Sequence, residues 1–131
     1  RTLSAWAQNL ASPPDAVRSA IKELWTIRRS RTDEIAVIAD LLAQSLHDEG
    51  LRPHLANYYR FAAQQVELHL DGQLKAVGLR PKVQASLIPR LLVGLLDGMV
   101  MQHFVDNNAI EDEELYRAIE AMTGSLFEFV G

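Results

Sequence analysis

The segment from Leu91 to Asn107 is apolar in nearly every direction around a helix, and it restricts the fold more than any other feature. At about 100° per residue, leucine, valine, methionine and phenylalanine cover almost its whole circumference. A helix of this kind must be buried on nearly all sides. Because a chain of 131 residues can rarely enclose one helix completely, we expect a second subunit to cover part of it. A monomer whose other helices cover everything is the alternative.

The same segment is not a membrane span. Asp97, Gln102 and His103 interrupt the apolar run well short of the roughly 20 residues that a span needs. No signal peptide is visible, and hydrophobic residues make up 48% of the chain and charged residues 23%, an ordinary globular balance. The chain has no cysteine, which excludes disulfides and thiolate metal sites. We therefore predict a soluble, cytoplasmic protein with no membrane partner.

Helical periodicity dominates the chain, and strand signals are nearly absent. The helices are expected to begin at proline, threonine or acidic residues and to end near glycine or cationic residues. The expected helices span 12–31, 32–50, 53–78, 81–108 and 111–126, after a leading helical piece at 3–10. Their short connections predict an all-α bundle of five to six helices.

Surplus apolar surface on the last two helices predicts a four-helix dimer interface built from two helices of each subunit. Gly94 and Gly98, four residues apart, would let a partner helix approach closely. Arg90 and Asp97 form a polar line that pairs either across the two-fold axis or within the subunit. The residues expected in this interface are Arg90, Gly94, Asp97, Gly98, Met101, Val105, Tyr116, Thr123 and Phe127.

The sequence carries no sign of catalysis, of a metal or of a cofactor. The residues three before the four histidines are not carboxylates, so the Glu-x-x-His pairs of bundle metal sites are absent. No nucleophile elbow, phosphate loop or dinucleotide fingerprint occurs. We predict a protein that is not an enzyme, with a small helical enzyme as the weakest alternative.

Several aromatic and polar residues fall on inward faces and predict a mostly apolar cavity for a small molecule. Taken singly, each is explained as ordinary core filling. Methionine side chains would make the walls adaptable. The residues expected to line the cavity are Trp6, Trp25, Leu42, Tyr58, Phe61, Gln65, Leu92, Leu96, Met99 and His103.

The order of these features resembles the C-terminal regulatory domain of TetR-family transcriptional repressors. The resemblance is carried by Leu92–Gln102, by Asp106 with the acidic helix from Glu111, and by the paired helices of 41–70 with their Asp-Glu-Gly-Leu-Arg-Pro connection. It covers roughly residues 13–130. It implies a homodimer held by the last two helices, a small-molecule effector in each subunit, and operator DNA bound by an N-terminal helix-turn-helix domain.

No helix-turn-helix stretch occurs in this chain, and its net charge is −4. We therefore expect residues 1–12 to be the remnant of a connecting helix, with a ragged N-terminus as the alternative, and 13–131 to form the regulatory domain. DNA binding would belong to an N-terminal domain absent from this chain. The rival function is a dimerisation module with a solid core. A closed cavity of roughly 300 Å³ or more distinguishes the two.

Overall fold

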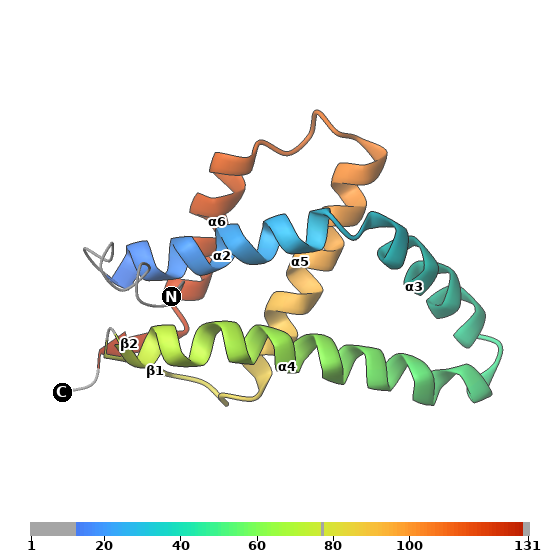
Figure 1. Cartoon of the computed structure of the whole chain (residues 1–131), viewed down its shortest axis with the longest axis horizontal. Helices are drawn as coiled ribbons and strands as arrows, with labels where there is room; N and C mark the ends of the chain where they lie inside the picture. Colours follow the sequence, from blue (N-terminus) through green and yellow to red (C-terminus); the bar gives the residue numbers. More distant parts are fainter. Residues whose placement is uncertain (1–12, 77, 130–131) are drawn as a thin grey trace.

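The computed structural model describes residues 13–76 and 78–129, which are almost entirely helical (Figure 1). The elements in chain order are α2 (Pro13–Arg29), α3 (Thr32–Ser45), the 3₁₀ turn η1 (Glu49–Leu51), α4 (Arg52–Ala76), β1 (Leu79–Pro81), α5 (Leu87–Val105), α6 (Asp112–Gly124) and β2 (Phe127–Phe129). The all-α prediction is confirmed. The leading piece at 3–10, with Trp6, lies outside the described residues.

α2 lies at the centre of the bundle, where it packs against α4, α5 and α6. α2 and α4 run in opposite directions, and α5 crosses both of them (Figure 1). α3 and the first half of α4 diverge from this centre as a pair. α3 contributes little to the core, because Ile35 is its only fully buried apolar side chain.

The core forms where the apolar stripes of these helices meet. Its most deeply buried large side chains are Trp25 and Ile21 of α2, Leu96 and Val100 of α5, and Ile119 of α6. Each helix contributes residues three or four apart, since that spacing places side chains on one face. Burial of each such side chain contributes about 1.5–3 kcal/mol to stability.

Two helix boundaries show how local chemistry ends a helix. Gly78 has φ of 75°, in the left-handed region that glycine adopts without strain, and its N–H donates to the Lys75 carbonyl at 3.1 Å. The Asp48 carboxylate accepts the Gly50 N–H at 3.0 Å and caps η1. The predicted stop at Gly78 is confirmed, whereas α3 ends at Ser45 and not at Gly50.

The expected start of a helix at Pro81 is wrong, because Pro81 lies in a short strand. β1 pairs with β2 in antiparallel register, with Arg80 opposite Glu128 and Pro81 opposite Phe127. The Lys82 N–H extends this pairing by donating to the Leu126 carbonyl at 2.7 Å. Strands of three residues are too short to show alternation in the sequence, and their partners are distant along the chain. α5 therefore begins later, at Leu87.

α5 is the one described helix that is long and apolar enough to cross a membrane. Its inner face, with Leu92, Leu96 and Val100, belongs to the core of the bundle. Its carboxylate at Asp97 is paired with Arg28 of α2. Packing in the core explains the apolar inner face of α5, but not its exposed apolar residues, such as Leu91 and Val105.

Candidate functional site

A buried polar cluster joins α2, α4 and α5 at the centre of the molecule. The Arg28 guanidinium donates to the Asp97 carboxylate from both Nε, at 2.8 Å, and Nη2, and also to the Tyr58 hydroxyl at 2.8 Å. Arg28 is only 9% exposed. A charge this deep requires a partner, because an unpaired buried ion loses its hydration without compensation. The expected polar contact of Asp97 with Arg90 is therefore corrected: its partner is Arg28, within the subunit.

Burial is the largest influence on the pKa of both charged members of this cluster. It lowers the pKa of Arg28, but hydrogen bonding and the charge of Asp97 outweigh it and leave that pKa raised. It raises the pKa of Asp97, and the Arg28 guanidinium counteracts this only in part. Burial also raises the pKa of the Tyr58 hydroxyl.

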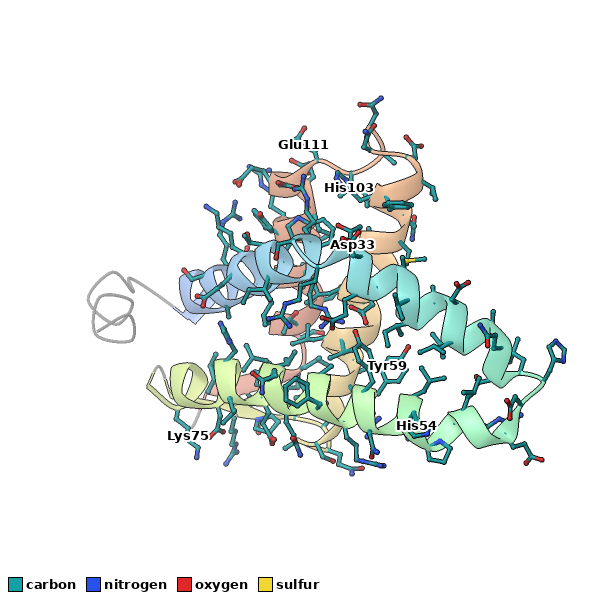
Figure 2. The ribbon with its side chains drawn as sticks, turned by 45° about the vertical axis from the view of Figure 1, so that its right-hand side comes forward. Asp33, His54, Tyr59, Lys75, His103 and Glu111 are labelled. Atoms are coloured by element: carbon teal, nitrogen blue, oxygen red, sulfur yellow. The ribbon has the colours of Figure 1, made fainter. Side chains whose placement is uncertain are left out.

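A second polar contact ties the end of α2 to the start of α6. The Trp25 Nε1–H donates to Asp112 at 3.1 Å, and Arg29 binds the same carboxylate at 3.0 and 2.9 Å. The His103 ring meets the Trp25 ring edge-on, with centroids 6.2 Å apart. His103 lies toward the end of α5 (Figure 2). Its Nδ1 is buried and has no hydrogen-bond partner among the described residues.

Trp25→Phe should lower the free energy of unfolding by about 2 kcal/mol, since it removes both apolar contacts and a hydrogen bond to a charged group. Asp112→Asn should cost less than about 1 kcal/mol, because an amide oxygen still accepts from Trp25 and the lost ion pair is half exposed. Urea unfolding of the two variants measures the difference. Equal losses would show that the Trp25 contact contributes nothing beyond the ion pair.

The structure brings only part of the predicted cavity set together, and as packed core: Trp25, Leu92 and Leu96 belong to one buried cluster, with Met99 packed against it. Leu92 and Leu96 are packed in the core, Trp25 and Tyr58 hold the polar contacts above, and Met99 and His103 are half-buried. Leu42, Phe61 and Gln65 are exposed, Phe61 at 56%. The helical spacing identified one face of α4, but α5 packs on the neighbouring face that carries Ala62, Val66 and Leu70. A second helix decides which of two adjacent apolar faces is buried.

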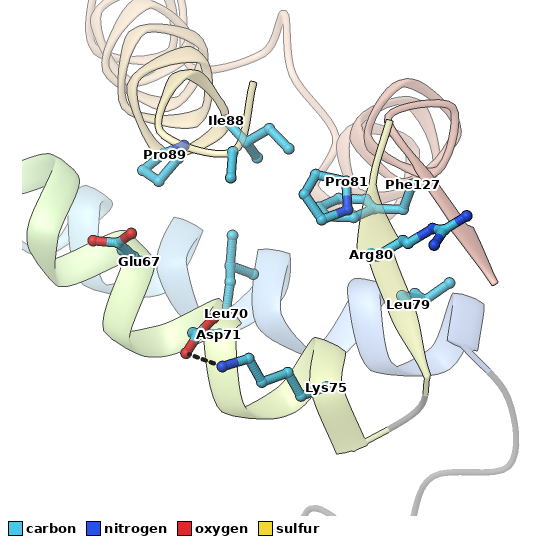
Figure 3. Close-up of a pocket in the computed structure, with 11 residues that line it drawn as sticks. Glu67, Leu70, Asp71, Lys75, Leu79, Arg80, Pro81, Ile88, Pro89 and Phe127 are labelled. Carbon is cyan, nitrogen blue, oxygen red and sulfur yellow. Dashed lines mark ion pairs between the residues drawn. The ribbon is translucent and has the colours of Figure 1, made fainter. Parts of the chain in front are cut away.

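A pocket of about 290 Å³ lies elsewhere, between the second half of α4, the start of α5 and the two strands (Figure 3). We call it the hairpin pocket. Its walls are mainly apolar, with charged side chains at the rim. It is lined by Glu67, Leu70, Asp71, Lys75, Leu79, Arg80, Pro81, Ala85, Ile88, Pro89 and Phe127.

Ile88 and Leu70 face one another across the hairpin pocket (Figure 3). Pro81 and Phe127 lie at the end of the pocket that is farther from Glu67 and Pro89. Leu70, Ile88 and Phe127 are buried. Two ion pairs hold rim charges in place: Lys75 with Asp71 at 3.4 Å and Arg80 with Glu128 at 2.9 Å. No predicted cavity residue lines this pocket, since it depends on a strand pair that sequence reasoning missed. Its one visible signal was the proline-rich stretch of 81–89 between two helical patterns.

The outer face of α5 is the second candidate site. Its exposed residues follow alternating steps of four and three, the spacing by which a helix presents one stripe to a partner helix. They are Leu87, Leu91, Gly94, Gly98, Met101 and Val105. A Cβ added at Gly94 or Gly98 would meet no atom within 4 Å. We call these six residues the α5 stripe.

Some of the predicted interface residues are exposed on this surface, and the others are buried within the subunit. Gly94, Gly98, Met101 and Val105 are exposed, as is Arg90, whereas Asp97 is tied to Arg28. The expected face of α6 is corrected, because Tyr116, Thr123 and Phe127 are buried within the subunit. α6 packs against α2 and exposes Ala118 and Met122.

Among the residues described, no group of three or more histidine, aspartate or glutamate side chains is arranged to hold a metal ion. The polar clusters are ion pairs between helices, and the hairpin pocket is apolar. Such an arrangement can bind an apolar molecule and can pair with another helical surface.

The fold is an all-α bundle, with an apolar pocket beside its strand pair and an exposed apolar face on α5. The family model of the C-terminal domain of BetI-type transcriptional repressors matches residues 13–128. The chain therefore belongs to this family of C-terminal domains of TetR-family transcriptional regulators. No curated protein and no solved structure matches the chain.

Proposed function

We propose that this domain senses a small, largely apolar effector and transmits its binding through a homodimer. The hairpin pocket is the observation that carries the proposal. Its volume of about 290 Å³ is close to the lower limit for small-molecule sites, roughly 300 Å³, but it is open to solvent and is not the closed cavity that the sequence predicts. A pocket of about 310 Å³ beside His103 is similar in volume, but Val100 is the only fully buried residue of its lining. The apolar walls of the hairpin pocket offer an effector more area removed from water.

The position of the hairpin pocket supports a coupling to the dimer. One wall is the start of α5, which continues into the α5 stripe, and another is β2, which follows α6 closely along the chain. A ligand there would contact Ile88 and Pro89 of α5 and Phe127 of β2, which adjoin the α5 stripe and α6 along the chain without belonging to the proposed interface. It would favour one arrangement of α5 relative to α6, by no more than its difference in affinity for the two arrangements.

The proposed dimer joins the α5 stripe and the exposed Ala118 and Met122 of α6 to their copies in a second subunit. Leu91 is 47% exposed and Val105 is 79% exposed in the single chain, an apolar surface that a partner would remove from water. We further propose that the domain acts in the cytoplasm as part of a repressor. A helix-turn-helix domain N-terminal to the regulatory domain would bind the operator.

The second candidate function is a dimerisation module that binds no ligand. It is favoured by Leu92 and Leu96, predicted cavity walls that are instead 3% and 1% exposed in the core. A ligand-binding experiment on the hairpin pocket separates it from the sensing domain.

Ala85→Phe should fill the hairpin pocket and weaken binding of the neutral fluorescent probe phenylnaphthylamine about tenfold, since its ring occupies space that the probe needs. Ala85 is exposed, so the substitution should change the free energy of unfolding by no more than about 0.5 kcal/mol. Probe fluorescence titrated against each protein measures the affinity.

Ala36→Phe is the matched control, because Ala36 is also exposed but lies on α3, away from the pocket. It should bind the probe as the unchanged chain does. A chain that shows no saturable binding would reject the sensing function in favour of the dimerisation module. Equal binding by both variants would place the effector outside the hairpin pocket.

A further inference from the structure

We propose that the ligand of the hairpin pocket is an amphipathic anion: an unbranched apolar chain that ends in a carboxylate. The inference rests on the proposed function, which requires only an apolar ligand. It adds a site for the polar end of that ligand, at the side of the pocket where Glu67 and Pro89 lie (Figure 3).

A second, smaller pocket of about 150 Å³ begins where the hairpin pocket ends. The two share Glu67 of α4 and Pro89 of α5, so they lie next to one another along the groove between these helices. The smaller pocket is also lined by Arg60, Ala63 and Gln64 of α4, by Ser86 just before α5, and by Arg90 of α5. We call it the arginine pocket. Four of its seven lining side chains can donate hydrogen bonds, whereas the hairpin pocket is walled mainly by apolar side chains.

The charges along this groove favour an anion at the arginine pocket. At the far side, Lys75 is neutralised by Asp71 and Arg80 by Glu128. Arg60 and Arg90 have no carboxylate within 4.0 Å among the described residues, although the Arg60 guanidinium donates to the Asn57 side chain. The lining of the arginine pocket thus carries two positive charges against the one negative charge of Glu67. This local excess lies on a chain whose net charge is −4.

A carboxylate suits these donors because the planar guanidinium presents paired N–H groups that match its two oxygens. Arg60 and Arg90 come from different helices, so an anion between them would join α4 to α5. The apolar chain would then extend past Pro89 toward Ile88 and Leu70. Glu67 lies at the junction of the two pockets, where its charge opposes the ligand and limits affinity.

The test compares decanoate with decanol, which share an apolar chain and differ in the charge of the end group. Calorimetric titration of the full chain should give an affinity for decanoate about tenfold above that for decanol, the sum of two exposed charge interactions. The double substitution Arg60→Gln and Arg90→Gln should remove this advantage and leave decanol binding unchanged. Arg117→Gln, on the exposed face of α6, is the control for a lost positive charge.

Glu67→Gln is a second variant, which should change decanoate affinity in the opposite direction to the arginine variants. It should strengthen decanoate binding severalfold and leave decanol binding unchanged. Equal affinities for decanoate and decanol would overturn the carboxylate class while the apolar effector pocket stands. If phenylnaphthylamine binds but neither ten-carbon ligand does, the elongated amphiphile is wrong and the proposed function stands. If none of the three binds, both proposals fail together.

Discussion

Asp97→Leu should lower the free energy of unfolding by about 3 kcal/mol, and Arg28→Met should lower it by a similar amount. Each substitution leaves one charge in the centre of the bundle without its partner. The Arg28 and Asp97 side chains are 11% and 18% exposed, so water compensates only part of the loss. Urea unfolding of the two variants, at equal protein concentration, measures both values.

The double variant, with Arg28→Met and Asp97→Leu together, should be within about 1 kcal/mol of the unchanged chain. Removing both charges also removes the need to compensate them, and apolar side chains of similar volume can fill the space. The Tyr58 hydroxyl then loses its donor, which accounts for the remaining loss. Losses that simply add in the double variant would show that the two charges do not stabilise one another.

The pH dependence of Arg28→Met provides an independent check with a definite sign. Burial already raises the pKa of Asp97, and the guanidinium that counteracts it is gone in this variant. A carboxyl group whose folded-state pKa is raised takes up a proton on folding, so its folded state gains stability as the pH falls through that pKa. The destabilisation by Arg28→Met should therefore be greatest at neutral pH and smaller in mild acid. A destabilisation that grows on acidification would contradict a buried, uncompensated carboxylate.

Gly98→Leu should weaken self-association of the chain about 100-fold, roughly 3 kcal/mol, if the α5 stripe forms the dimer interface. Because the proposed dimer is symmetric, the substitution adds one leucine side chain from each subunit to the interface. Within one subunit the same change is harmless, because a Cβ at Gly98 meets no atom within 4 Å. Leucine is also the better helix former, by about 0.8 kcal/mol. Sedimentation equilibrium over a range of concentrations measures the association.

The control is Ala43→Leu, which adds an exposed leucine to α3, away from the proposed interface. It should associate as the unchanged chain does. The Gly98→Leu variant should remain folded, with unfolding no easier than that of the unchanged monomer. Unaltered association of Gly98→Leu would remove Gly98 from the interface and leave the apolar α5 stripe without an explanation.

The helices could be predicted from local signals, and the pockets could not. Apolar periodicity located all five α-helices of the described chain, and Gly78 marked the end of α4 because its left-handed conformation is a local property. The hairpin pocket depends on Pro81 opposite Phe127, residues far apart in sequence. The predicted cavity failed for a related reason: Phe61 and Ala62 are neighbours on one helix, and only the packing of α5 buries the second and exposes the first.

The sequence by itself determined that this protein is a helical bundle with one helix, α5, apolar on almost all sides. That follows from side-chain spacing and hydrophobicity, which act within each segment. The tertiary structure decided that Arg28 lies inside with Asp97, that α6 turns Tyr116 inward and Met122 outward, and that a pocket opens beside the strands. Adjacent faces of a helix differ by only about 100° of rotation, and contacts between distant segments select which of them is buried.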